Sequence, residues 1–195
     1  MLATALVLLA LQQPGPLIFD GKTLDGWTPI GGGTWVAKDG MIVGTSAPGQ
    51  PQGLLLWKDP VKDFHATLKF RINAGDSGFY FRVALTDKDP FCEGFQVEID
   101  TTPETGGIYE TAGRGWVNLP DPALHHKSGY KAGQWTDLDV TAVGTHYKVL
   151  VNGTLITDID DAKGRTEGRL ALQLHGNMDM DVSFKDVRLQ EIQTN

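Results

Sequence analysis

Two carboxylates lie two residues apart in a segment where polar and apolar side chains alternate. In the run FQVEID, residues 95–100, the apolar residues alternate with Gln96, Glu98 and Asp100. Side chains alternate across a strand, so we expect Glu98 and Asp100 to share one face, roughly 6.5 to 7 Å apart at their backbones. Two such carboxyl groups can converge on a substrate or a metal ion, and their repulsion raises the pKa of one, which suits general acid or base catalysis. The alternative is a solvated outer face of an antiparallel sheet.

The preceding segment adds polar side chains to the same expected face. Tyr80 and Arg82 alternate with phenylalanines in residues 78–85. If this strand pairs with residues 95–100, both side chains lie beside Gln96, and we expect all three to bind substrate. Arg82 could bind a substrate oxygen or stabilise developing negative charge. Its structural alternative is an ion pair with one of the two carboxylates.

His175 is the best single proton carrier of the chain, because an unperturbed imidazole titrates at about pH 6.5. It follows Gln173 on an alternating strand and precedes Gly176, which puts it at a strand end, where loops gather site residues. We expect His175 to be catalytic and Gln173 to bind substrate; the alternative is a hydrogen-bonded structural histidine. The adjacent His125 and His126 lie in a long loop and diverge, so a metal pair there is disfavoured.

Two aromatic residues flank a charged stretch after the Gly106-Gly107 turn. Tyr109 precedes Glu110, and Trp116 follows Arg114. Aromatic rings beside carboxylates suit stacking on the apolar faces of sugars, so we expect Tyr109 and Trp116 to bind substrate. Packing in the core or at the rim is the alternative.

The elements that position these residues read as strands, because the apolar period is two from Leu17 onward. About a dozen short strands with frequent turns, which the 24 glycines and 10 prolines also indicate, favour two antiparallel sheets packed face to face, an all-β jelly-roll sandwich. The clearest alternating segments are residues 64–72, 78–85, 95–99, 170–174 and 182–189.

Turn chemistry predicts how some of these strands connect. Asp39-Gly40 and Asn152-Gly153 each separate two alternating runs, and both dipeptides suit type I′ hairpins. We also expect residues 64–72 and 78–85 to form a long hairpin. Residues 121–126 could form at most one helical turn within the long loop 117–134, and loops of that length are usually functional or mobile.

Composition bounds the function classes. The chain has 195 residues and a formal net charge of −7, with no run of Lys or Arg, which disfavours nucleic acid and an anionic membrane surface as partners. It lacks a Gly-rich phosphate loop, a nucleophile elbow, paired cysteines and a zinc-protease helix. The single Cys92 is expected to be a buried small residue.

The N-terminus resembles a targeting segment. Residues 2–11 form an uninterrupted apolar run, which is too short for the roughly 20 residues of a membrane-spanning helix. We therefore expect residues 1–13 to be a signal peptide, residues 17–195 to form one domain, and the protein to be exported to the periplasm or the extracellular space. The alternatives are a frayed N-terminal strand or a wrongly assigned start of the sequence.

Seven ordered motifs make the chain resemble the 3-keto-disaccharide hydrolase domain family, long classed as a domain of unknown function. The resemblance covers nearly the whole chain after the N-terminal segment. The motifs are LIFDGKTLDGW (17–27), WVAKDGMIVG (35–44), DFHATLKFR (63–71), SGFYFR (77–82), GFQVEID (94–100), GGIY (106–109) and LQLHG (172–176).

The resemblance implies a concanavalin A-like jelly roll that acts on 3-keto-glycosides made by a partner sugar oxidoreductase. A ketone at C3 acidifies the C2 proton; a base removes that proton, the aglycone leaves C1, and water adds back. Glu98, Asp100, His175 and Arg82 match the family's motif positions and supply a base, an acid and an electrophile. The individual roles stay open, as does a divalent metal ion in place of Arg82.

Two other functions fit the same residues. Sugar-binding modules without catalytic activity share the sandwich architecture. A conventional glycosidase could use Glu98 and Asp100 on unoxidised sugars. A comparison of keto and unoxidised substrates, and of binding with turnover, separates the three.

Overall fold

The computed structural model describes residues 15–87 and 91–193, which contain fourteen strands and one short helix. Nearly every element is a strand, as the period-two pattern predicts. The strands are β1 (Trp27–Gly31), β2 (Thr34–Lys38), β3 (Met41–Ser46), β4 (Gly53–Val61), β5 (Phe64–Ala74), β6 (Asp76–Leu85), β7 (Cys92–Asp100), β8 (Ile108–Thr111), β9 (Gly115–Asn118), β10 (Thr136–Val143), β11 (His146–Val151), β12 (Thr154–Asp160), β13 (Gly168–Leu174) and β14 (Met180–Glu191).

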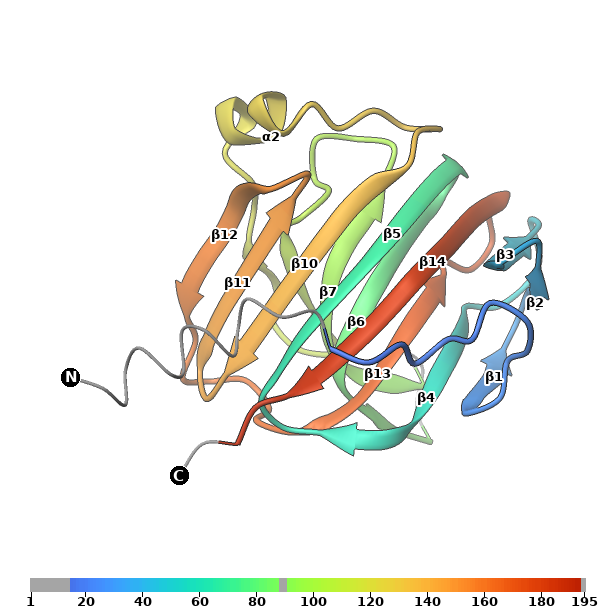
Figure 1. Ribbon diagram of the computed structural model, residues 1–195, viewed down its shortest axis with the longest axis horizontal. Coiled ribbons are helices and arrows are strands. Elements are labelled where there is room, and N and C mark those ends of the chain that lie inside the picture. Colours follow the sequence, from blue (N-terminus) through green and yellow to red (C-terminus); the bar gives the residue numbers. More distant parts are fainter. Residues whose placement is uncertain (1–14, 88–90, 194–195) are drawn as a thin grey trace.

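The strands form two seven-stranded antiparallel sheets that pack face to face (Figure 1). One sheet has the order β1-β4-β13-β6-β7-β8-β9 and is called the β7 sheet below. The other has the order β12-β11-β10-β5-β14-β3-β2 and is called the β5 sheet. This is a concanavalin A-like jelly-roll sandwich, and it confirms the fold class that the sequence predicts.

The main core lies between the sheets, where strands turn apolar residues to one side, and a smaller buried cluster includes Leu54, Leu56 and Tyr80. Along β10 the side chains of Leu138, Val140 and Ala142 are buried, and the residues between them are more exposed. Aromatic rings fill the centre, where Phe81 stacks on Phe95 with ring centroids 5.2 Å apart. Burial of this apolar surface is the main stabilising term of the fold.

Both hairpins with type I′ dipeptides are confirmed. Asp39-Gly40 joins β2 to β3, and Asn152-Gly153 joins β11 to β12. All four residues have positive φ, at 52°, 77°, 48° and 75° in chain order. Aspartate and asparagine tolerate this left-handed conformation and glycine adopts it without strain, so the local chemistry decided these turns.

The expected hairpin between residues 64–72 and 78–85 is wrong. β5 pairs with β10 and β14, whereas β6 pairs with β7 and β13, so the two strands belong to opposite sheets. The chain crosses at Gly75, with φ of 90°. The apolar faces of both strands then meet across the core, as in the edge contact of Phe64 with Phe79. The alternating pattern shows only that one face of each strand is buried. Two such strands can be hydrogen-bonded neighbours in one sheet or can face each other from opposite sheets, and the pattern is the same in both cases.

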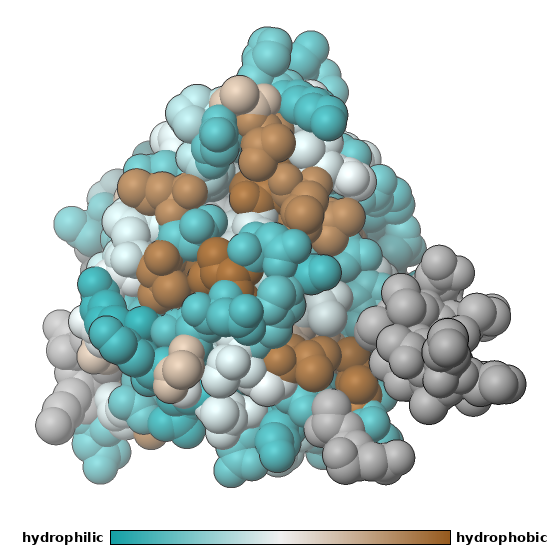
Figure 2. Space-filling view, turned by 90° about the vertical axis from the view of Figure 1, so that its left-hand side faces the viewer, coloured by the Kyte–Doolittle hydropathy of each residue, from teal (hydrophilic) through white to brown (hydrophobic). Residues whose placement is uncertain are grey.

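The helix is longer than the single turn expected. α2 spans Pro122–Ser128, with the Asp121 carboxylate accepting a hydrogen bond from the Ala123 N–H at its start. It packs against β12 at one edge of the sandwich. On that side of the molecule, hydrophobic side chains occur in separate groups among hydrophilic ones (Figure 2). Leu124 of α2 and Leu155 of β12 are among the exposed apolar residues.

The structure bears on the expected burial of Cys92 but not on the expected signal peptide. Cys92 is a free, buried cysteine, as expected. The signal peptide expected at residues 1–13 lies outside the described residues. Over the part of the chain that is described, helices long and apolar enough to span a bilayer are absent.

Candidate active site

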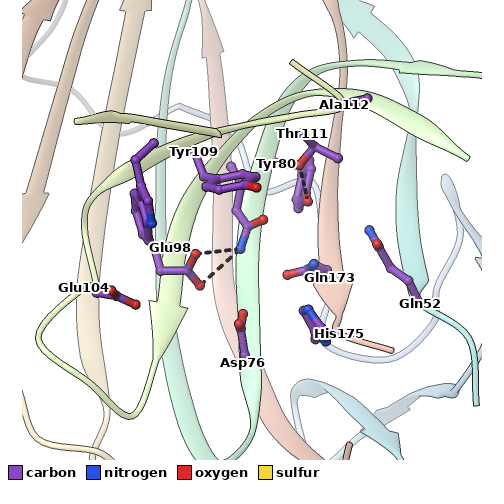
Figure 3. A pocket seen from close by; sticks show the side chains of 12 residues that line it. Gln52, Asp76, Tyr80, Glu98, Glu104, Tyr109, Thr111, Ala112, Gln173 and His175 are labelled. Atoms are coloured by element: carbon purple, nitrogen blue, oxygen red, sulfur yellow. Dashed lines mark hydrogen bonds between the residues drawn. The ribbon is translucent and has the colours of Figure 1, made fainter. Parts of the chain in front are cut away.

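A cavity of about 470 Å³ opens on the outer face of the β7 sheet, the face turned away from the core (Figure 3). Strands β6, β7, β8, β9 and β13 contribute to its lining. The lining residues are Gln52, Asp76, Tyr80, Gln96, Glu98, Glu104, Tyr109, Thr111, Ala112, Trp116, Gln173 and His175.

Strand register brings the polar residues of the cavity together. β6 pairs with β7 so that Tyr80 lies opposite Gln96, and Gly78 lies opposite Glu98. Gly78 leaves space that the Gln96 side chain fills, because a Cβ at position 78 would lie 2.5 Å from Gln96 Cγ. From there Gln96 Nε2 donates hydrogen bonds to both carboxyl oxygens of Glu98, at 3.1 and 3.0 Å.

Glu98 and Asp76 form a carboxyl pair within the cavity. Glu98 is only 6% exposed, and burial raises its pKa to about 10, together with the negative charge of Asp76, a hydrogen bond to Asp76 and the charge of Asp100. Burial also raises the pKa of Asp76, and the hydrogen bond from Glu98 opposes that rise. Two carboxyl groups that share a hydrogen bond hold one proton between them. Near neutral pH, Glu98 therefore carries the proton and Asp76 accepts from it.

His175 faces the same cavity from the end of β13 (Figure 3). Its Nδ1 lies 2.8 Å from the Gly176 carbonyl oxygen. A carbonyl only accepts hydrogen bonds, so Nδ1 carries a proton, and in the neutral form of the ring the lone pair lies on Nε2. A proton acceptor and a proton donor thus face one hollow.

The hairpin β8–β9 forms an aromatic wall of the cavity. Tyr109 and Trp116 are cross-strand partners, and their rings meet edge to face with centroids 5.4 Å apart. Arg114 at the turn of this hairpin donates to both carboxylate oxygens of Asp161, at 2.9 and 2.6 Å, and to Glu110. The bidentate pair ties the hairpin to the segment after β12 and holds the wall in place.

Seven of the nine site residues expected from the sequence line this one cavity. The Tyr80 hydroxyl is bonded to Thr111 Oγ1 at 2.7 Å, which fixes its position at the floor. The seven residues are Glu98 and His175, expected to be catalytic, and Tyr80, Gln96, Tyr109, Trp116 and Gln173, expected to bind substrate.

Asp100 does not line the cavity. Its carboxylate accepts hydrogen bonds from Thr105 Oγ1 at 2.8 Å and from Thr102. The loop after β7 folds back and encloses the side chain, which is 5% exposed. The expectation that Asp100 is catalytic is therefore corrected: its side chain is enclosed outside the cavity, and its charge helps to raise the pKa of Glu98.

Arg82 is also absent from the cavity. A bulge interrupts the β6–β7 pairing between Phe81 and Ala84, and Arg82 there has φ of 56°. This shift of phase turns its side chain into the core, where it is 0% exposed and donates to Tyr147 Oη and to the Gly144 carbonyl oxygen, at 2.8 and 2.7 Å. The expected substrate-binding role is wrong, because the guanidinium binds several loops together instead.

Sequence reasoning missed five lining residues, of which Asp76 is the most consequential. It lies two residues before Gly78 and four before Tyr80, so the period-two rule already puts it on the same face. The others come from loops or a strand end, for which no local pattern signals a cavity. They are Gln52, Glu104, Thr111 and Ala112.

The residues give little support to a resident metal ion. Within the described ranges, no group of three or more His, Cys, Asp or Glu side chains is arranged to hold one. His125 packs its ring against Tyr130 at a centroid distance of 5.5 Å, outside the cavity.

Comparison with known proteins gives one family and a set of similar folds. The chain matches, over residues 16–190, the family model described as 3-keto-alpha-glucoside-1,2-lyase-like domain. No curated protein sequence matches it.

Three solved structures illustrate the fold. A Parabacteroides distasonis protein classed as a glycosyl hydrolase has a TM-score of 0.69 at 20% identity, covering 95% of this chain and 97% of that one. The carbohydrate binding module CBM66 of Bacillus subtilis has 0.66 at 19%, covering 90% and 100%. The carbohydrate recognition domain of Emp46p has 0.62 at 12%, covering 93% and 97%. At these identities the likeness establishes the fold alone.

Proposed function

Because the chain belongs to the 3-keto-alpha-glucoside-1,2-lyase-like domain family, we propose that it cleaves the glycosidic bond of 3-keto-glycosides by elimination and rehydration. A base takes the C2 proton, the C2–H electron pair forms a C1=C2 double bond, and the C1–O bond breaks. The leaving oxygen takes a proton from an acid. Water then adds across the double bond, which makes net hydrolysis.

The protonation states of the cavity support a division of these roles. His175 Nε2, with its free lone pair, is the base that takes the C2 proton. Glu98, which carries the proton of the pair with Asp76, is the acid that protonates the leaving oxygen. The observation that carries this proposal is that Glu98, whose pKa burial raises, and His175, whose Nδ1 is held by the Gly176 carbonyl oxygen, line one cavity.

The aromatic wall and the N-terminal sequence extend the proposal. Tyr109 and Trp116 present ring surface on which a sugar ring can stack. The apolar residues 2–11 favour export, so the protein would meet its substrate in the periplasm or outside the cell. A sugar oxidoreductase that forms the C3 ketone would act before it.

The test is aglycone release from two 3-keto-glucosides, one with a nitrophenyl and one with an alkyl aglycone. Nitrophenolate leaves as a stable anion and an alkoxide does not, so only the second substrate needs an acid. Glu98→Gln should keep nitrophenol release within about 10-fold and lose about 100-fold or more on the alkyl substrate. His175→Asn should lose about 100-fold or more on both.

Glu104→Gln is the matched control, because Glu104 lines the same cavity but is exposed. It should keep both activities. An equal loss on both aglycones in Glu98→Gln would remove Glu98 from the role of acid. If the parent protein releases neither aglycone, the proposed reaction is wrong.

A noncatalytic sugar-binding module is the second candidate. A solved module of this architecture, CBM66, is aligned along its whole length with this chain, and the aromatic wall suits binding without chemistry. Saturable binding of sugars with no aglycone release would favour this candidate.

The geometry does not fit a conventional glycosidase. Such enzymes hold their two carboxyl groups about 5 to 5.5 Å apart when they retain configuration and about 6.5 to 9.5 Å apart when they invert it. Asp100 lies outside the cavity, and Asp76 and Glu98 are in hydrogen-bond contact. Carboxyl groups that share a hydrogen bond are closer than either glycosidase spacing.

A further inference from the structure

Two buried hydrogen-bond acceptors of the cavity have no partner within the protein. They are Gln173 Oε1 and Asp76 Oδ1. Buried polar atoms are nearly always paired, because an unpaired one loses its hydration without compensation. Gln173 is 2% exposed, so bulk water does not replace the missing partner. Both atoms therefore lack a hydrogen-bond donor that a ligand can supply.

The surrounding structure holds these acceptors at the cavity rather than leaving them as packing faults. The backbone oxygen of Gln173 accepts from Ser77 Oγ at 2.7 Å, which links β13 to β6 beside Gly78. Asp76 begins β6 two residues before Gly78. Gln173 and Asp76 lie around the same hollow, whose lining also includes the Gln96 side chain that fills the space beside Gly78 (Figure 3).

The cavity also has a one-sided charge. Asp76, Glu98 and Glu104 contribute carboxyl groups, and no Lys or Arg occurs among the described residues that line it. Even with one proton shared by the buried pair, the site is negative. An anionic ligand would be repelled and would find no guanidinium or ammonium partner. Hydroxyl groups of a neutral ligand donate to acceptors at no such cost.

We infer that the cavity selects neutral glycosides over uronates and sugar phosphates, and that Gln173 and Asp76 each accept a hydrogen bond from a hydroxyl group of the sugar. This inference deepens the proposed function and rests on it for the sugar identity. Gln173 is a specificity-determining residue that contacts substrate away from the bond that breaks. Asp76 combines hydroxyl recognition with its hydrogen bond to Glu98.

The experiment measures binding, by titration calorimetry, of methyl 3-keto-glucoside, its 4-deoxy and 6-deoxy analogues, and the counterpart with a carboxylate at C6. Every protein that is titrated also carries His175→Asn, because the proposed reaction would cleave this alkyl glycoside during the titration. The parent protein should bind the neutral glycoside about 10-fold or more tightly than the carboxylate. Gln173→Met should weaken binding of the parent sugar about 10- to 100-fold. One deoxy analogue should bind to Gln173→Met with the same affinity as to the parent, because that analogue already lacks the hydroxyl group that Gln173 accepts from.

Gln190→Met, on β14 of the opposite sheet, is the matched control and should bind every probe as the parent does. Gln173→Met should fold with a Tm at least equal to that of the parent, since methionine has a similar length and leaves no unpaired acceptor. A Tm several degrees lower would assign Gln173 a structural partner and overturn the inference. Equal binding of all probes by Gln173→Met and the parent would also overturn it, as would equal affinity for the carboxylate.

Failure of the proposed function has a different signature. If the protein binds the neutral sugar with this selectivity but releases no aglycone, the inference stands and the proposed reaction is refuted. If the parent and Gln173→Met cleave 3-keto-glucosides equally well, the proposed reaction stands and the inference about Gln173 is refuted.

Discussion

Replacement of Glu98 by glutamine should make the protein more stable at neutral and alkaline pH. In the unfolded chain this carboxyl has its ordinary pKa of about 4.5, and in the fold burial and the neighbouring carboxylate Asp76 raise its pKa to about 10. Between these two values the folded state binds one more proton than the unfolded state. The stability of the parent therefore falls as pH rises through this window.

The size of the effect follows from the width of the window. One extra bound proton changes the free energy of unfolding by about 1.4 kcal/mol per pH unit. Between pH 5 and pH 8, both inside the window, the contribution of Glu98 falls by up to about 4 kcal/mol. Glutamine is isosteric and carries no charge, so Glu98→Gln removes this term. We expect the variant to gain about 2–4 kcal/mol over the parent across that range.

Urea titrations at pH 5, 6, 7, 8 and 9 measure this difference. The parent, Glu98→Gln and Glu104→Gln are compared, because Glu104 is an exposed carboxylate at the same cavity. The control should follow the parent, whereas the Glu98→Gln curve should diverge upward with pH. Parallel curves for the parent and Glu98→Gln would mean that Glu98 is ionised in the fold. The assignment of Glu98 as the acid would then fall with the prediction.

Three further substitutions test the parts that hold the site. Arg82→Met should lower the free energy of unfolding by about 3 kcal/mol or more in urea titrations, because several buried acceptors lose their donor. The KM of the folded protein should not change. A raised KM at unchanged stability would contradict the structural role of Arg82. Gly78→Ala should displace the Gln96 amide, since the new Cβ would lie 2.5 Å from Gln96 Cγ. This variant should lower kcat about 10-fold and change the free energy of unfolding in urea only slightly. An unchanged kcat would refute the argument from this contact. Arg114→Met should free the β8–β9 hairpin from Asp161 and raise KM about 5- to 10-fold, with kcat nearly unchanged. Arg114→Lys should restore part of the lost affinity. An equal fall of kcat in both variants would argue against the role of Arg114 in positioning the aromatic wall.

The strands and the tight hairpins follow from the sequence because their causes are local. One buried face demands apolar residues at every second position, as along Leu138, Val140 and Ala142. Asp39-Gly40 and Asn152-Gly153 adopt positive φ at low energy, so those turns form wherever the chain places them. The side-by-side pairing of β6 with β7 also follows, since their short connection favours an antiparallel neighbour.

The core of the site could be predicted for the same reason. Tyr80, Gln96 and Glu98 share a face once β6 and β7 pair, and alternation alone assigns that face. Asp76 follows the same period and could have been found from it. The protonation of Glu98 could not, because its pKa depends on burial by other elements and on a carboxylate from a neighbouring strand.

The tertiary structure decided the rest. A bulge turns Arg82 into the core, a returning loop encloses Asp100, and the turn at Gly75 sends β5 and β6 to opposite sheets. Each depends on contacts between residues distant in the chain, which compete with the local pattern and outweigh it. Amino-acid order thus determined which faces are polar and which are apolar, whereas packing determined which polar groups reach the cavity and which of them keep a proton.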